Sequence, residues 1–152
     1  MKSDIIVFQE QRFHFGINPD EFEDNFSLNS AWISPSEIST KLWRFERKNP
    51  PEKGYFLHFG ALLDLTSVYF NNGSQIFMKR TPERQLIGIC ISSAIFQISL
   101  KKNNQKIIEI DEFDHIPADL PKTIFNHILR YQQKNIFIVD PLLLFRAYQL
   151  LY

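Results

Sequence analysis

The stretch Tyr69-Phe70-Asn71-Asn72-Gly73-Ser74-Gln75-Ile76-Phe77 holds the strongest turn signal in the chain. An Asn-Gly pair supplies the positive φ angles that a tight hairpin turn requires. Apolar runs lie on both sides of this turn, and β-branched or aromatic residues in such runs favour strands. The sequence therefore predicts an antiparallel hairpin whose two strands are residues 62–70 and 75–79.

This hairpin lies in a longer region, residues 54–113, in which short apolar runs alternate with short polar turns. Short strands with short connections usually pair with their neighbours in sequence. We therefore expect an antiparallel β-meander of about five or six strands over this region. Ahead of it, residues 4–9 favour a first strand, residues 13–15 can also be extended, and residues 18–24 can start a short helical turn.

A helix is predicted before the meander, at about residues 35–48. Ser34 can cap this helix, Pro35 suits its first position, and Glu37 completes a capping box. Apolar residues then recur at i, i+4 and i+7, which places them on one helix face; they are Ile38, Leu42 and Phe45. The proline pair after Asn49 ends the helix because the residue before a proline avoids the α region.

Two further helices are predicted in the C-terminal part, at about residues 120–133 and 141–151. Asp140 before Pro141 is a typical start for the second of these helices. Residues 135–139, between the two helices, favour a short buried strand or a connector. The expected fold class is therefore α+β: a meander packed by one helix from the N-terminal half and by two C-terminal helices. The length fits a single domain, residues 1–152.

The composition limits the expected partners and location. The chain has 17 basic and 17 acidic residues, so its formal net charge is zero, whereas nucleic-acid binders usually show a basic excess. Cys90 is the single cysteine and cannot form an internal disulfide. No apolar stretch reaches the roughly 18 residues that a membrane span needs. We therefore expect a cytoplasmic protein with a buried thiol at Cys90 that binds neither membranes nor nucleic acids.

The sequence contains no motif for catalysis, phosphate binding or metal binding. The four histidines are His14, His58, His115 and His127. None of them has metal-ligand spacing from another. Asp111 and Asp114 beside His115 are the one cluster that could hold a metal, and a solvated acidic strand end explains them better. We therefore expect no metal and no cofactor.

The remaining signal is the distribution of aromatic, arginine and acidic residues. Tryptophan, tyrosine and arginine dominate many protein interfaces, and they gather here between Trp32 and Tyr55. Residues 107–121 carry five acidic residues and no basic one. We interpret the chain as a non-enzymatic module that binds one protein partner, such as an immunity protein that blocks a bacterial toxin, or a secretion chaperone. The predicted contact residues are Trp43, Arg44, Arg47 and Tyr55 on a basic side and Glu109, Asp111, Glu112 and Asp114 on an acidic side.

Two other functions stay open. A small metal-independent hydrolase or nuclease would bring two of the four histidines together with a carboxylate in one cleft. A self-assembling subunit would use the leucine-rich last helix, at about residues 141–151, as a dimer seam. No motif in the sequence assigns the chain to a known family.

Overall fold

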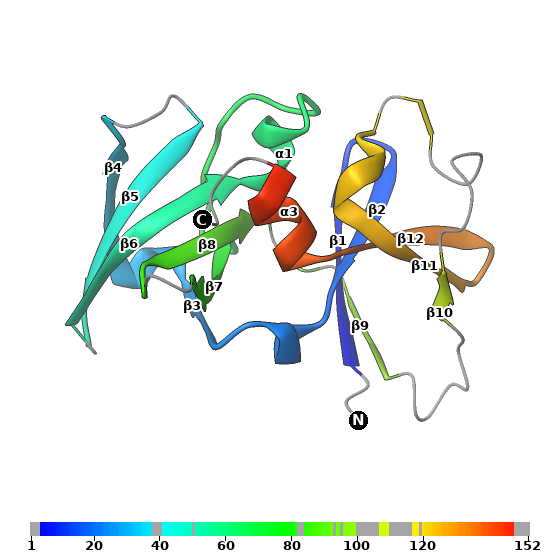
Figure 1. Ribbon diagram of the computed structural model, residues 1–152, viewed down its shortest axis with the longest axis horizontal. Helices are drawn as coiled ribbons and strands as arrows, with labels where there is room; N and C mark the ends of the chain where they lie inside the picture. The colour runs from blue at the N-terminus through cyan, green and yellow to red at the C-terminus, as the bar shows by residue number, and fades with distance from the viewer. Residues whose placement is uncertain are drawn as a thin grey trace. The chain divides into compact units, whose positions relative to one another are not determined.

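The computed structural model describes residues 4–37, 41–49, 51–81, 84–92, 94, 96–99, 107–109, 117–118 and 120–147. The chain forms two compact units, the first from residues 1–21 with 94–151 and the second from residues 22–93 (Figure 1). This division does not test the expectation of a single domain over residues 1–152, which stays a prediction. Within the described residues, no helix is long and apolar enough to cross a membrane.

The first unit is built on a six-stranded sheet with the strand order β10-β11-β12-β2-β1-β9. Its strands are β1 (Asp4–Glu10), β2 (Phe13–Ile17), β9 (Phe96–Ser99), β10 (Ile107–Glu109), β11 (Phe125–Tyr131) and β12 (Lys134–Val139). Short helical elements accompany them: η1 (Pro19–Glu21), η4 (Lys122–Ile124) and α3 (Pro141–Ala147). All neighbouring strands are antiparallel except β12 and β2, which are parallel.

Both faces of this sheet carry buried apolar side chains. One face carries an aliphatic cluster made of Ile5, Val7, Ile98, Leu129, Ile136 and Ile138. On the other face phenylalanine rings of β1, β2 and β11 pack together, with centroids 5.6 Å apart for Phe8 and Phe15 and 5.8 Å apart for Phe15 and Phe125. A strand buried on both faces reads as a nearly continuous apolar run, so its sequence lacks the alternation that marks a half-exposed strand.

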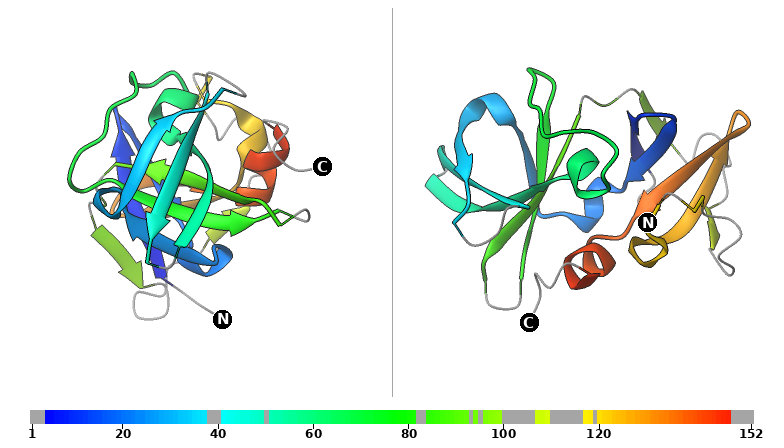
Figure 2. Two further views of the ribbon diagram at one scale, coloured as in Figure 1. Left: turned by 90° about the vertical axis from the view of Figure 1, so that its left-hand side faces the viewer. Right: turned by 90° about the horizontal axis from the view of Figure 1, so that it is seen from above.

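The second unit is built on another six-stranded sheet, with the order β3-β7-β8-β6-β5-β4. Its strands are β3 (Asp24–Ser27), β4 (Ala31–Pro35), β5 (Leu42–Lys48), β6 (Pro51–His58), β7 (Gln75–Arg80) and β8 (Leu86–Ile91), with η2 (Leu28–Ser30) and α1 (Phe59–Leu62) between them. The sheet is strongly twisted, and Figure 2 (left) shows β5 crossing the green strands β7 and β8 at a steep angle. Its concave side holds a core that includes Phe26, Phe45, Phe56, Ile76 and Met78.

The expected α+β fold with one meander and three helices is wrong, because two curled sheets make up most of the described structure. The meander fails because β6 pairs with β8 in parallel, while β7, between them in sequence, pairs with β8 and β3. The predicted helix at residues 35–48 is replaced by the end of β4 and by β5. Alternation explains this outcome, since Trp43, Phe45 and Arg47 face one side of β5 and Leu42, Arg44 and Glu46 face the other. Leu42 and Phe45 are thus both buried, but on opposite faces of the strand.

The predicted helix at residues 120–133 is also wrong, because this segment forms η4 and β11. A hairpin joins β11 to β12, with Tyr131 directly opposite Lys134. Its two turn residues, Gln132 and Gln133, have φ angles of 50° and 66°. Paired positive φ angles are typical of the type I′ hairpin turn, which usually contains Asn-Gly. Two glutamines in this turn give no turn signal in the sequence.

Residues 62–70 do not form the first strand of the predicted hairpin, because α1 and an irregular loop occupy them. A turn does follow, but it joins no hairpin, and neither Asn72 nor Gly73 has the positive φ angle expected of the Asn-Gly pair. The N–H of Gly73 donates to Oδ1 of Asn71 at 2.8 Å, and the N–H of Ser74 donates to the Asn71 carbonyl at 3.1 Å. The expected strands at residues 4–9, 13–15 and 135–139 are confirmed as β1, β2 and β12.

The expected last helix is confirmed as α3, which spans Pro141–Ala147, and residues 148–151 lie outside the described part of the chain. Its start has the cap that the sequence predicts. Oδ1 of Asp140 accepts hydrogen bonds from the N–H groups of Leu142 at 2.9 Å and Leu143 at 3.1 Å. These bonds satisfy two of the backbone donors that a helix leaves unpaired at its N-terminus.

Candidate functional site

Polar side chains gather on one face of the sheet in the second unit, over β4, β5 and the first half of β6. On β5, the exposed residues Arg44 and Glu46 alternate with the buried residues Phe45 and Arg47. The strand register places Arg44 between Ser34 of β4 and Tyr55 of β6, and it places Glu46 between Trp32 of β4 and Lys53 of β6. Side chains directly opposite each other on neighbouring strands lie on the same face of a sheet. We call the face formed by Trp32, Ser34, Arg44, Glu46, Lys53 and Tyr55 the Trp32 face.

A groove of about 430 Å³ runs along this face. Its lining residues are Trp32, Ile33, Ser34, Arg44, Phe45, Glu46, Lys53, Gly54, Tyr55, Arg80, Arg84, Gln85 and Leu86. Four of these residues are basic and one is acidic, so the groove favours an anionic or acidic ligand. Trp32 is 73% exposed, which is unusual for the residue type with the largest apolar surface.

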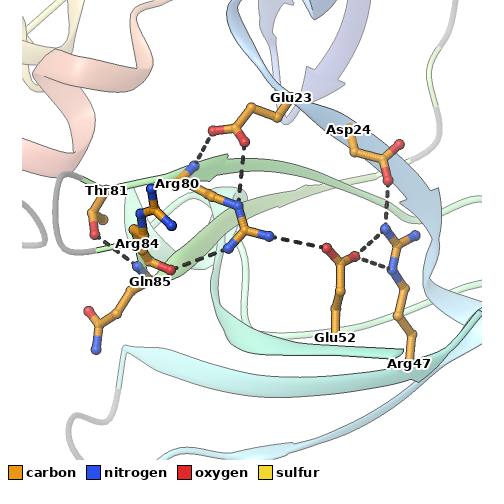
Figure 3. A network of polar contacts seen from close by, with 8 residues as sticks. All are labelled: Glu23, Asp24, Arg47, Glu52, Arg80, Thr81, Arg84 and Gln85. Carbon is orange, nitrogen blue, oxygen red and sulfur yellow. Dashed lines mark hydrogen bonds and ion pairs between the residues drawn. The ribbon is translucent and has the colours of Figure 1, made fainter. Parts of the chain in front are cut away.

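A network of charged side chains stabilises the concave side of the same sheet (Figure 3). Arg47 is only 6% exposed; its Nη2 donates to Oδ2 of Asp24 at 2.6 Å and its Nε donates to Oε1 of Glu52 at 2.9 Å. Its guanidinium carbon lies 4.4 Å from the ring centroid of Phe26. The hydrogen bond from Arg47 lowers the pKa of the Asp24 carboxyl. Arg47 thus joins β5 to β3 and β6.

The network continues to the turn between β7 and β8. The N–H of Arg80 donates to Oε2 of Glu23 at 2.6 Å, and Nη2 of Arg80 lies 3.5 Å from Oε2 of Glu52. Nη1 of Arg80 donates to the carbonyl of Arg84 at 3.3 Å. These contacts (Figure 3) fix the backbone of Arg84, which is one of the residues that line the groove. Neither Arg84 nor Lys53 forms an ion pair within the described residues, so both cations are available to a ligand.

The structure separates the four basic-side residues that the sequence singles out. Arg44 and Tyr55 lie opposite each other and line the groove together. Trp43 faces the other side of the sheet, where its ring packs edge-on against Phe70 at a centroid distance of 5.1 Å. Arg47 is buried in the network described above. Of these four residues, only Arg44 and Tyr55 therefore lie on the Trp32 face.

The acidic-side residues lie elsewhere. Glu109 is the last residue of β10 in the first unit, in register with His127 of β11. Asp111, Glu112 and Asp114 fall outside the described residues. Sequence reasoning did not place Trp32, Lys53 and Arg84 among the contact residues. Strand alternation on β4, β5 and β6 would have placed Trp32 and Lys53 with Arg44, had the segment been interpreted as strand.

The histidines that the structure describes are divided between the two units. His14 lies on β2 and His127 on β11, and β12 separates these strands by roughly 10 Å in all. His58 belongs to the second unit, where its Nδ1 accepts from the N–H of Ala61 at 3.0 Å and its Nε2 lies 2.8 Å from the Tyr69 carbonyl oxygen. Burial lowers the pKa of His58. The ring thus bonds backbone groups of α1 and of the loop that follows it.

His115 lies outside the described residues, and with it the acidic cluster that could hold a metal. Among the residues that are described, no three His, Cys, Asp or Glu side chains gather in a way that could hold a metal ion. Cys90 is a buried free thiol on β8, as the sequence predicts.

Comparisons with known proteins define the fold. No protein-family model and no curated protein sequence matches the chain. Among solved structures, the chain is similar to the scaffolding protein TtCheW from Thermoanaerobacter tengcongensis, with a TM-score of 0.66. The similarity covers 92% of this chain and 85% of that chain at 13% sequence identity. The chain thus has a CheW-like fold, and at this identity the likeness concerns the fold alone.

Proposed function

We propose that this chain is a non-enzymatic module that binds one protein partner through the Trp32 face. The observation that carries the proposal is a 73% exposed tryptophan beside an open groove with more basic than acidic side chains. Tryptophan, tyrosine and arginine are the residues most often found at the energetic hot spots of protein interfaces. The likeness to a protein described as a scaffolding protein supports the same class of function.

The contacts on this face divide into an anchor and a charged rim. Trp32 supplies the apolar area, and Tyr55 extends that area across β5 and β6. Arg44, Lys53 and Arg84 supply positive charge that attracts an acidic surface and speeds association. Arg44 forms an exposed ion pair with Glu37 at 3.4 Å. An exposed pair of this kind stabilises the chain little, so Arg44 can exchange Glu37 for a carboxylate of the partner at small cost.

More specific expectations, an immunity protein against a bacterial toxin or a secretion chaperone, gain no support from the fold and are left to the identity of the captured partner. The hydrolase or nuclease alternative is not favoured by any described residue. It needs two histidines beside a carboxylate, whereas the ring of His58 bonds backbone groups and His14 and His127 lie two strands apart.

Capture from a lysate of the source cell tests the proposal. The tagged full chain should retain one protein in stoichiometric amount, and Trp32→Ala should weaken its binding by roughly 30-fold, the loss typical of a hot-spot residue. Arg44→Glu should weaken binding and reduce its sensitivity to salt. Leu142→Ala is the matched control, because Leu142 is also a large exposed apolar residue, 47% exposed, but lies on α3 in the first unit. Equal capture by wild type, Trp32→Ala and Arg44→Glu would refute the proposal.

A further inference from the structure

The strand β4 ends the sheet of the second unit, and its backbone register shows which groups face outward. The N–H of Ser36 donates to the Leu42 carbonyl at 3.1 Å. In an antiparallel ladder, hydrogen-bonded pairs alternate with pairs that are not hydrogen-bonded. The register therefore makes Ser34 with Arg44, and Trp32 with Glu46, the other hydrogen-bonded pairs between β4 and β5.

The other residues of β4, which are Ala31, Ile33 and Pro35, point their backbone groups away from β5. The N–H of Ala31 donates to the carbonyl of Leu28, and Pro35 has no N–H to donate. The outward edge thus offers one donor, the N–H of Ile33, and three acceptors, the carbonyls of Ala31, Ile33 and Pro35. Within the described residues no other strand pairs with this edge. We call these four groups the β4 edge.

We propose that the β4 edge accepts an extended segment of the protein partner as an added strand, in which acidic and apolar residues alternate. This inference rests on the proposed function and specifies how the partner is held. Strand addition to an exposed sheet edge draws affinity from backbone hydrogen bonds and specificity from alternate side chains. Pro35 lacks a donor, so pairing is confined to a short segment of about three to five residues.

The two faces of β4 dictate the alternation. Side chains of an added strand on the convex side would lie next to Trp32 and Ser34, at the groove lined by Arg44, Lys53 and Arg84. Carboxylates are complementary to that charge. Side chains on the concave side would lie next to Ala31 and Ile33, which pack against the apolar core cluster of the unit. Aliphatic or aromatic residues suit these positions.

A second copy of this chain fits the β4 edge less well than a different protein. Two copies paired antiparallel through β4 would bring two Trp32 faces onto one side of the joined sheet, and each face carries Arg44 and Lys53 against the single carboxylate of Glu46. Like charges across an interface oppose association. The charge of the Trp32 face therefore selects an acidic segment of another protein.

The matched pair Ile33→Pro and Ile33→Ala tests the inference. Both substitutions replace the branched Ile33 side chain by a smaller one, but only proline also removes the outward N–H. Proline is tolerated at an edge where that N–H faces solvent. The probe is a displayed library of random ten-residue peptides, selected on the wild-type chain. We expect the selected peptides to alternate acidic and apolar residues. Their affinity for Ile33→Ala should lie within about threefold of their affinity for wild type, and their affinity for Ile33→Pro should be at least tenfold weaker.

Hydrogen exchange of the wild-type chain supplies a readout that does not depend on any variant folding. The Ile33 amide should exchange much faster than the amides of Trp32 and Ser34 in the free chain, and it should become protected when a selected peptide binds. Any of four results would overturn the inference. Peptides could bind Ile33→Pro and Ile33→Ala equally, or the selection could yield no alternating peptides. The exchange of the Ile33 amide could be unchanged by peptide, or the chain could form dimers through β4. A captured partner that depends on Trp32 but is indifferent to Ile33→Pro would refute strand addition alone and leave the proposed function standing.

Discussion

Replacing Arg47 by methionine should destabilise the chain without removing a contact to the partner. Arg47 is 6% exposed, pairs with Asp24 and Glu52, and covers the ring of Phe26. Removing one member of a buried ion pair typically costs about 3–5 kcal/mol, because the other member loses its compensation. We expect the lower end here, about 3 kcal/mol, because the Asp24 side chain is 50% exposed and stays hydrated, while Glu52 keeps Arg80.

Arg44→Met is the internal control for this substitution. Arg44 lies on the same strand as Arg47 and differs chiefly in the face that it occupies, and its only ion pair in the described structure is exposed. Exposed pairs contribute roughly 0–1 kcal/mol, so Arg44→Met should leave the free energy of unfolding within about 0.5 kcal/mol of wild type.

Urea and thermal unfolding measure the difference. Arg47→Met should lower Tm by about 6–12 °C, since 1 kcal/mol corresponds to about 2–4 °C in a chain of this length. The stability difference between wild type and Arg47→Met should become smaller as the pH falls below about 4, the ordinary pKa of an aspartate. Arg47 lowers the pKa of Asp24 in the folded chain, so its stabilisation is present above that pH and is lost as Asp24 becomes protonated. A stable Arg47→Met variant beside a destabilised Arg44→Met variant would refute the assignment of the two faces.

Three further predictions concern stability. Burial lowers the pKa of His58, so folding stability should fall as the pH drops below about 6.5, where the unfolded chain binds the proton more strongly. In urea unfolding between pH 7.5 and 5.5, the free energy of unfolding should depend less on pH for His58→Asn than for wild type. A wild-type stability that rises on acidification would contradict this. Gly54→Ala should cost about 1–3 kcal/mol, because its Cβ would lie 2.6 Å from the Leu86 carbonyl oxygen; unchanged Tm would show that this contact relaxes freely. Asp140→Ala should cost about 1 kcal/mol through the lost cap of α3, whereas Asp140→Asn, which retains an acceptor, should cost less.

The sequence predicted local elements where a single residue type enforces the backbone. Asp140 before Pro141 marked the start of α3. The Asn72-Gly73 pair marked a turn, but not the positive φ angles or the hairpin that were expected of it. Prediction from the sequence failed where a turn or a strand pairing contains no residue type that is diagnostic of it. Gln132 and Gln133 adopt positive φ angles because the β11–β12 hairpin requires them, and nothing local announces that turn. The parallel pairing of β6 with β8 joins segments that are distant in sequence, so no local pattern could reveal it.

The candidate site was predicted in part for the same reason. Sequence reasoning singled out arginine and aromatic residues between positions 32 and 55, and the Trp32 face lies there. A helical interpretation of residues 35–48 could not separate Arg44 from Arg47. On a strand the two residues are three apart and face opposite sides, so one is exposed and the other is buried. The distinction between a contact residue and a core residue therefore depended on the secondary structure.

Hydrogen–deuterium exchange of the chain with its captured partner tests the central claim most directly. The account predicts new protection of backbone amides in residues 31–36 and 42–55, which carry the Trp32 face and the β4 edge, and no new protection in α3. Protection confined to the first unit, with residues 31–36 and 42–55 unchanged, would contradict the proposal that the partner binds through the Trp32 face.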